Sequence, residues 1–149
     1  MSRVVRVRSL AAQRRSLVKA LASALGRWRQ TPGPDASERR DLAAFCLEQL
    51  HGLEALTETT TSAWEKRGYW MKADRYRMEW RWVAEAQGLV LEAATLLPPM
   101  PLPAPLDELW QSRLAVHFPQ RAPRTPAWQG AGSAHRDDAK GGSLNRRLP

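Results

Sequence analysis

Apolar side chains between residues 62 and 97 recur at steps of three and four, which is the spacing of one face of an α-helix. They form two neighbouring rows. The first row, which includes a glycine and an arginine, consists of Trp64, Gly68, Met71, Arg75, Met78, Trp82, Ala86, Leu89, Ala93 and Leu96. The second row consists of Tyr69, Ala73, Tyr76, Trp80, Val83, Val90, Ala94 and Leu97. Two rows give a wide apolar surface, which predicts a helix buried against more than one neighbour.

Both ends of this predicted helix carry recognisable signals. Ser62 and Glu65 have the spacing of a capping box, in which each side chain accepts a hydrogen bond from the other residue's backbone N–H. Pro98 and Pro99 end the helix, because proline has no N–H and restricts the residue before it. The pattern therefore predicts one helix over residues 62–97.

Gly68 leaves a second interpretation open. It follows Lys66 and Arg67, and cations in the last turn followed by glycine are typical of a helix C-terminus. If the helix is continuous, Gly68 instead marks a place where a neighbouring helix comes close. We expect continuity, with a break at Gly68 as the alternative.

Two further helices are predicted before residue 62. The first covers residues 9–30, and its apolar stripe consists of Leu10, Leu17, Leu21, Ala24, Leu25 and Trp28. Two prolines and a glycine in residues 31–34 predict a turn. A second stripe predicts a helix over residues 37–59, and the run from Thr59 to Ser62 suits a helix poorly, so the next turn is expected there. One very long helix is the alternative, but a hairpin covers apolar faces that a lone rod leaves exposed.

The composition changes after residue 97. Residues 98–105 contain five prolines and predict an extended connector. Apolar positions over residues 106–117 predict a short fourth helix that folds back onto the others. Proline, glycine, serine and charge dominate from residue 119, so we expect a disordered basic tail over residues 119–149. The predicted fold is all-α, an antiparallel three-helix bundle with a short fourth helix, in one domain over residues 1–118.

The net charge of +8 at pH 7 is distributed unevenly. Residues 1–30 contain eight basic and no acidic residues, whereas residues 31–60 contain six acidic and two basic ones. The eight basic residues are Arg3, Arg6, Arg8, Arg14, Arg15, Lys19, Arg27 and Arg29. An acid-free basic helix is typical of proteins that bind nucleic acid, so RNA or DNA is the alternative partner. Pairing with the acidic second helix is the competing interpretation.

Residues with obvious chemistry are few. Glu48 and His51 have the spacing of half a carboxylate di-iron site, but the second half is missing, and His51 is expected to be partly buried. Cys46 lies on an apolar stripe, where a thiol is usually inert. The chain contains no nucleophile-elbow, phosphate-loop or dinucleotide motif. We therefore predict no enzymatic activity, no metal and no cofactor.

Aromatic and basic side chains alternate over residues 64–82. We interpret these tryptophans as buried beneath arginine stems, and we expect Arg75 to be a buried arginine. The chain has seven tryptophans, more than one small core needs, and Trp110 and Trp128 are expected to remain for a partner. The leading hypothesis is a non-catalytic binding or scaffold module that acts through protein–protein contacts.

The cysteine content and the N-terminal sequence bear on the cellular compartment of the protein. A single cysteine excludes an internal disulfide and suits a reducing compartment, which predicts a cytoplasmic protein. An Arg-rich, acid-free N-terminus is also typical of a mitochondrial transit peptide, which stays the alternative. We expect no membrane-spanning helix, because no run of about 18 uncharged apolar residues is present.

Overall fold

A computed structural model describes residues 9–119 and 125–133, and all regular structure in these ranges is helical. The elements are α1 (Leu10–Trp28), α2 (Ala36–Lys66), α3 (Trp70–Glu79), α4 (Trp82–Ala94), α5 (Ala104–Leu109), the π-helical turn η1 (Trp110–Leu114) and the 3₁₀ turn η2 (Ala115–His117). The all-α prediction is confirmed. Several helix boundaries differ from those expected, and each difference has a local physical reason.

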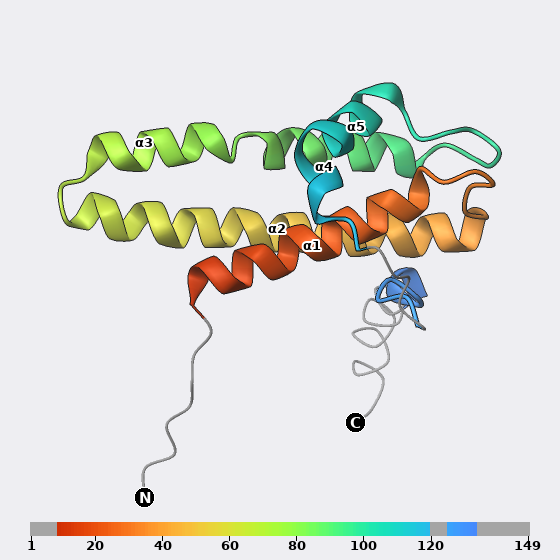
Figure 1. The fold of residues 1–149 in the computed structure, drawn as a ribbon, viewed down its shortest axis with the longest axis horizontal. Helices are drawn as coiled ribbons and strands as arrows, with labels where there is room; N and C mark the ends of the chain where they lie inside the picture. The colour runs from red at the N-terminus through yellow and green to blue at the C-terminus, as the bar shows by residue number, and fades with distance from the viewer. Residues whose placement is uncertain (1–8, 120–124, 134–149) are drawn as a thin grey trace, which may run out of the picture.

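The long helix α2 contacts α1, α3 and α4 (Figure 1). α1 and α2 form an antiparallel hairpin, and α3 and α4 then run back along α2, one after the other. α5 contacts α4, and the η1 and η2 turns that follow contact α1. The turn between α2 and α3 extends beyond the first residues of α1. The molecule is therefore thick at one end and narrows to a two-helix hairpin at the other.

The core lies at the thick end, where leucines from several helices meet. Its fully buried large side chains include Leu21, Leu25, Leu42, Leu50, Leu53, Val90, Leu106 and Leu114. These residues come from α1, α2, α4, α5 and η1, so their burial joins segments that are distant in the sequence. Removal of this apolar area from water supplies the main favourable term for folding.

The turn expected over residues 59–62 is wrong, because α2 continues to Lys66. The threonine hydroxyls there donate to backbone carbonyls one turn earlier. Thr60 Oγ1 donates to the Leu56 carbonyl at 2.8 Å, and Thr61 Oγ1 donates to the Thr57 carbonyl at 2.9 Å. These bonds satisfy the hydroxyls inside the helix, so the side chains of Thr60 and Thr61 can be buried.

α2 ends at Lys66, and the chain turns at Gly68, so the continuous helix over residues 62–97 is also wrong and the alternative break is correct. Gly68 has φ of +82°, which disfavours side chains with a Cβ. Its N–H donates to the Glu65 carbonyl, and the Tyr69 N–H donates to the Trp64 carbonyl, both at 2.9 Å. This pair of bonds is a Schellman motif. A Cβ at Gly68 would meet no atom within 4 Å, so no neighbouring helix comes close there.

A second break, which the spacing does not predict, separates α3 from α4 at Trp80 and Arg81. In a regular helix, residues two apart point to different sides. The break instead brings the rings of Trp80 and Trp82 together, with centroids 5.8 Å apart. The two apolar rows of the sequence are thereby divided between two helices.

The buried arginine is Arg39 of α2, and the expectation for Arg75 is wrong because Arg75 is exposed. The Arg39 guanidinium donates to the carbonyls of Pro34 at 3.4 Å and Leu96 at 3.3 Å, and also to that of Met100. In the described residues no carboxylate lies within ion-pairing distance of it. Arg39 therefore joins the start of α2 to the chain that follows α4.

Part of the predicted tail packs on α2. The Trp128 indole N–H donates to Glu38 Oε2 at 3.2 Å, and its ring meets the edge of Phe45. Asp41 accepts hydrogen bonds from the backbone N–H groups of Gly130 and Gly132 at 3.0 and 2.9 Å. Disorder from residue 119 onward is therefore wrong for residues 125–133. Residues 120–124 and 134–149 lie outside the described part of the chain.

The conformation of Gly68 predicts opposite effects for two glycine substitutions. Gly68→Ala should lower the free energy of unfolding by about 1 kcal/mol, because alanine is strained at positive φ. Gly88→Ala, inside α4 with open space around its Cβ position, should raise it by about 0.5–1 kcal/mol. Urea unfolding followed by circular dichroism measures both. Equal effects at the two positions would contradict the Schellman assignment.

The Arg39 contacts predict a large difference between neighbouring arginines. Arg39→Met should lower the free energy of unfolding by about 2–4 kcal/mol, because three backbone carbonyls lose a charged donor. Arg40→Met is the matched control, since Arg40 is exposed, and it should change stability by less than about 0.5 kcal/mol. Chemical denaturation at pH 7 compares them. A small effect at Arg39 would show that water replaces its bonds.

Candidate functional site

Trp110 and Trp128, the two tryptophans expected to remain for a partner, are both buried. Trp110 is 8% exposed; its indole N–H donates to the Ala22 carbonyl at 2.9 Å, and the Arg29 guanidinium lies 4.2 Å from its ring. Trp128 is 6% exposed. Both rings are used in packing within the chain. Their assignment to a partner is a prediction that the structure does not favour.

Large exposed apolar side chains gather instead on α3 and the residue before it. Tyr69 is 55% exposed, Trp70 61%, Met71 73% and Met78 71%. We call these four residues the α3 surface. They lie on the two-helix hairpin at the narrow end of the molecule (Figure 1).

The exposure of this surface follows from the packing of α3. Ala73 is the buried residue of α3, and Tyr76 meets the edge of Trp64 on α2 with ring centroids 5.1 Å apart. Met71 and Met78 lie on the opposite side of the helix, and Trp70, three residues before Ala73, lies at the flank between the two sides. The first apolar row was expected to be buried here, which is wrong because α3 is covered mainly on the side that faces α2.

Basic side chains surround the α3 surface. Lys66, Arg67 and Arg75 are exposed, and the Lys72 ammonium lies 4.4 Å from the ring of Trp64. Asp74 is the acidic residue on the same outward side, with a side chain that is 77% exposed. The surface thus combines apolar side chains with an excess of positive charge.

The eight basic residues of the N-terminal segment have different surroundings. Arg3, Arg6 and Arg8 lie outside the described residues. Arg27 forms an ion pair with Glu38, and Arg29 forms one with Asp107, each at 2.7 Å. Five of the eight are described, and two of these are therefore neutralised by intramolecular partners.

Arg14, Arg15 and Lys19 line hollows beside α1. One of these hollows has a volume of about 750 Å³, and we call it the α1 cleft. It lies between α1, the α3–α4 break and the turns after α5. Its lining residues are Arg14, Arg15, Val18, Glu79, Trp80, Trp82, Ser112, Arg113 and His117.

Two arginines of the cleft lie over aromatic rings. The Arg14 Cζ is 5.0 Å from the ring centre of Tyr76 and 5.3 Å from that of Trp80. The Arg113 Cζ is 5.9 Å from the ring centre of Trp82. These distances are within the range of cation–π attraction. The break between α3 and α4 places both Trp80 and Trp82 beside this cleft. A regular helix would not direct two residues with this spacing to the same side.

The electrostatics of the cleft are dominated by arginine. Among its described lining residues Glu79 is the only acid, and no carboxylate of the described chain lies within 4.0 Å of a cleft cation. Burial raises the pKa of the Tyr76 hydroxyl above its ordinary value, and the Arg14 charge partly opposes this rise. The phenol beneath Arg14 therefore stays neutral at physiological pH.

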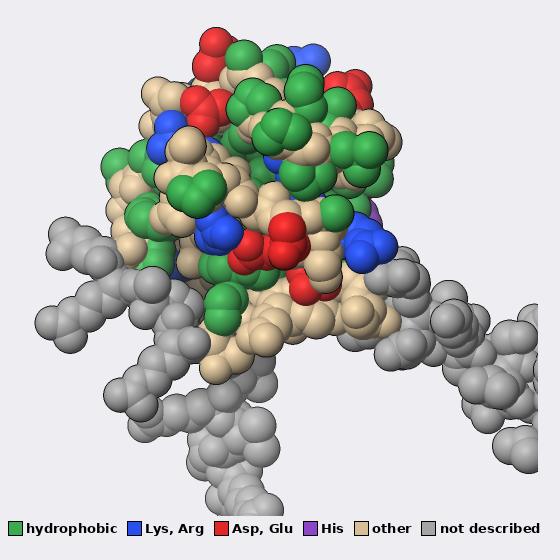
Figure 2. Space-filling model, turned by 90° about the vertical axis from the view of Figure 1, so that its right-hand side faces the viewer, with side chains coloured by type: hydrophobic (Ala, Val, Ile, Leu, Met, Phe, Trp, Pro, Cys, Tyr) green, Lys and Arg blue, Asp and Glu red, His purple; other side chains and the backbone are tan. Residues whose placement is uncertain are grey.

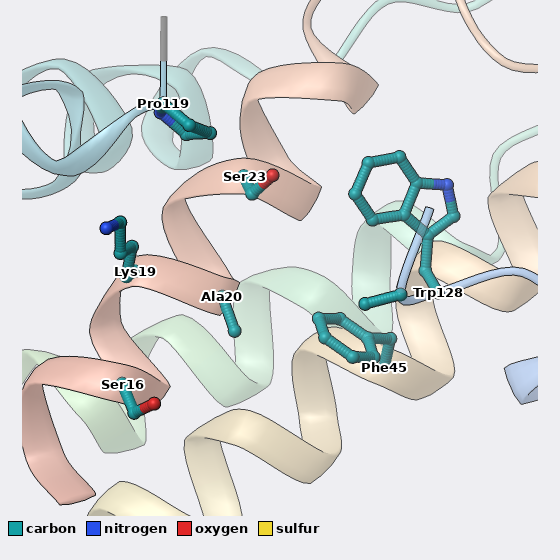
Figure 3. Close-up of a pocket in the computed structure, with 8 residues that line it drawn as sticks. Ser16, Lys19, Ala20, Ser23, Phe45, Pro119 and Trp128 are labelled. Atoms are coloured by element: carbon teal, nitrogen blue, oxygen red, sulfur yellow. The ribbon is translucent and has the colours of Figure 1, made fainter. Parts of the chain in front are cut away.

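Two smaller hollows continue from the cleft along α1. One of about 620 Å³ shares Arg15 and His117 with it and is also lined by Lys19. The other, of about 300 Å³, has Lys19 and two serines of α1 on one side and Phe45 and Trp128 on the other (Figure 3). The basic side of α1 is therefore hollowed along much of its length.

The thick end of the molecule has a different surface. Figure 2 looks at the end that carries the α1–α2 turn and the proline-rich connector. Acidic, basic and apolar side chains are interspersed on this face. On the part of this face that the structure describes, charges of one sign do not cluster as they do in the α1 cleft.

The residues considered for catalysis do not assemble into a site. Cys46 is fully buried, and burial raises the pKa of its thiol far above the ordinary value, so the reactive thiolate is suppressed. His51 is exposed rather than partly buried, contrary to expectation. Among the described residues, no three histidine, cysteine, aspartate or glutamate side chains are placed to hold a metal ion.

Comparison of the chain with protein-family models, curated proteins and solved structures finds no match. Within residues 9–119 and 125–133, no helix has the length and apolar character needed to cross a membrane. The candidate sites therefore rest on the geometry of this chain.

The Arg29–Asp107 pair predicts a pH-dependent contribution to stability. The hydrogen bond from Arg29 lowers the pKa of Asp107 below its ordinary value, so the folded state favours the carboxylate. This stabilisation is present above the unfolded-state pKa and is lost as the pH falls through the folded one. Asp107→Asn should therefore cost about 0.5–1 kcal/mol at pH 7, a modest value because the pair is partly open to solvent.

Unfolding free energies at a series of pH values test this prediction. The difference between wild type and Asp107→Asn should be constant above about pH 5 and should shrink as the pH falls through the lowered pKa of Asp107 in the folded state. Glu108→Gln is the matched control, because Glu108 is the exposed neighbour. A cost that is independent of pH would contradict a contribution from the ion pair.

Proposed function

We propose that the chain is a non-catalytic binding module that contacts a protein partner through the α3 surface. The observation that carries this proposal is the exposure of Tyr69, Trp70, Met71 and Met78, each more than half accessible, on one short hairpin. Contiguous apolar surface on a folded chain is typical of interaction sites. This surface replaces Trp110 and Trp128 as the proposed point of contact.

The residue types on the α3 surface suit protein recognition. Tryptophan and tyrosine provide large rigid contact areas and are enriched among residues that dominate binding energy. Methionine is flexible and polarisable, so it adapts to an irregular partner surface. Met71 and Met78 lie seven residues, or about two helical turns, apart on the outward side of α3, which is the spacing of the anchor residues of a helix that binds in a groove.

Charge defines the chemistry of the partner. Lys66, Arg67 and Arg75 outnumber Asp74 around the α3 surface. A partner with an apolar groove and an acidic rim would complement both the methionines and the cations. We therefore propose an acidic-rimmed protein groove as the occupant.

Nucleic-acid binding through the first helix stays an alternative prediction. Arg15 and Lys19 are exposed, whereas Arg27 and Arg29 are already ion-paired. Among the described residues of the first helix, Arg14 and Arg15 line the α1 cleft, and Lys19 lines the hollow beside it. A reducing, cytoplasmic location is also a proposal, which the buried free thiol of Cys46 supports.

The α3 surface predicts a specific loss of partner affinity. Proteins captured from the native host by the immobilised full chain would be purified and titrated individually. Trp70→Ala should weaken the binding of the true partner about 30-fold, which corresponds to a hot-spot cost of about 2 kcal/mol. Combining it with Met71→Ala and Met78→Ala should weaken binding further.

Leu91→Ala is the matched control, because Leu91 of α4 is 56% exposed but lies outside the α3 surface. It should change affinity by less than about twofold. Equal affinities of wild type and the α3 variants for every captured protein would contradict the proposal. Failure of the wild type to retain any protein would also contradict it.

A further inference from the structure

The α1 cleft brings together three arginines from two distant parts of the chain. Arg14 and Arg15 belong to α1, and Arg113 belongs to η1, about 100 residues later. His117 of η2 adds ring nitrogens that can donate a hydrogen bond. The fold thus surrounds one hollow with several hydrogen-bond donors directed by different elements.

The aromatic contacts leave part of each guanidinium free for a ligand. Arg14 lies over Tyr76 and Trp80, and Arg113 lies over Trp82, so the rings cover faces of the guanidinium groups. The N–H donors lie in the guanidinium plane and match the oxygens of phosphate or carboxylate. The Arg14 Nε is buried and has no hydrogen-bond partner among the described residues.

Charge and volume narrow the chemical class of the ligand. Three arginines against Glu79 leave an excess of two positive charges in the cleft. A phosphate monoester carries about −1.5 to −2 charges at pH 7, whereas a carboxylate carries one. The volume of about 750 Å³ is in the range of sites for organic ligands and exceeds the need of a bare phosphate ion.

The remaining lining supplies an apolar, aromatic wall. Trp80 is half-buried, and Val18 also lines the cleft. An aromatic ring system can stack on tryptophan whatever its pattern of hydrogen-bonding groups. The cleft therefore offers a phosphate-binding side and a side for a planar body.

We propose that the α1 cleft binds an organic phosphate monoester with a planar aromatic body, of which a nucleoside monophosphate is the simplest example. The phosphate is held by Arg14, Arg15 and Arg113, and the planar body contacts Trp80. The same chemistry occurs in a free nucleotide and at a phosphorylated end of a single strand. This site is separate from the α3 surface and does not depend on the proposed protein partner.

Titration of the full chain with AMP tests the proposal. Calorimetry gives the affinity, and the indole N–H signals in a ¹H–¹⁵N spectrum locate the site. The signals of Trp80 and Trp82 should shift, whereas those of Trp70 and Trp128, which do not line the cleft, should not. Adenosine should not bind detectably, and inorganic phosphate should bind at least about tenfold more weakly than AMP.

Variants with opposite expected effects separate binding from folding. Arg15→Gln combined with Arg113→Gln should weaken AMP binding at least about tenfold. The double variant loses two guanidinium groups, each of which can donate two parallel N–H bonds to phosphate oxygens. Glu79→Gln should strengthen it about threefold, because the acid of the cleft is removed. Arg75→Gln, the exposed control on α3, and Trp70→Ala should each change it by less than about twofold.

Oligonucleotides distinguish the two sources of the phosphate. A short single strand with a 5′-phosphate that binds more tightly than AMP, while the same strand without it fails to bind, identifies a strand end as the ligand. If AMP binds at least as tightly as this strand, the free nucleotide is identified as the ligand. Equal binding of both strands would overturn the proposal in favour of backbone recognition. Absence of AMP binding, or an affinity that Glu79→Gln does not raise, would also overturn it.

Discussion

Burial of both sides of α2 is the interaction on which the rest of this structure depends. Leu42, Leu50 and Leu53 of α2 are buried, and α2 contacts α1, α3 and α4. A helix of this length gains most of its stability from such packing rather than from intrinsic propensity. The other helices are placed by the side of α2 that each one covers.

The ends of α2 decide where the remaining chain can go. At its start, Arg39 holds the carbonyls of the loop before it and of the connector after α4. At its end, Gly68 reverses the chain with a conformation that other residues adopt at a cost. Because α2 extends past the first residues of α1, its last turns have α3 as their neighbour. This mismatch in length leaves the outward side of α3 uncovered.

The two proposed surfaces arise from two different kinds of irregularity. The α3 surface exists because the helices differ in length, so Met71 and Met78 remain exposed on the side of α3 that faces away from α2. The α1 cleft exists because the chain breaks at Trp80 and Arg81, which turns Trp82 towards Arg113. The first surface is apolar with basic surroundings, and the second is basic with aromatic walls. Different partners can therefore occupy the chain without competing for the same side chains.

The sequence by itself determined the all-α class, the apolar stripes of α1 and α2, the burial of Cys46 and the signal for a break at Gly68. These features depend on spacing or on one residue's conformational preference, which are local. Only the tertiary structure decided which parts of the two apolar rows of residues 62–97 are buried: both rows contribute buried residues in α4, whereas Met71 and Met78 of the first row are exposed on α3. Both rows fit a helix, and the choice depends on how many neighbours each helix has. The same reason applies to Trp110, Trp128 and Arg75, whose exposure is set by segments far away in the sequence. Residues 59–62 are helical although their local preference predicts a turn, because that preference is weak and the burial of Thr60 and Thr61 outweighs it.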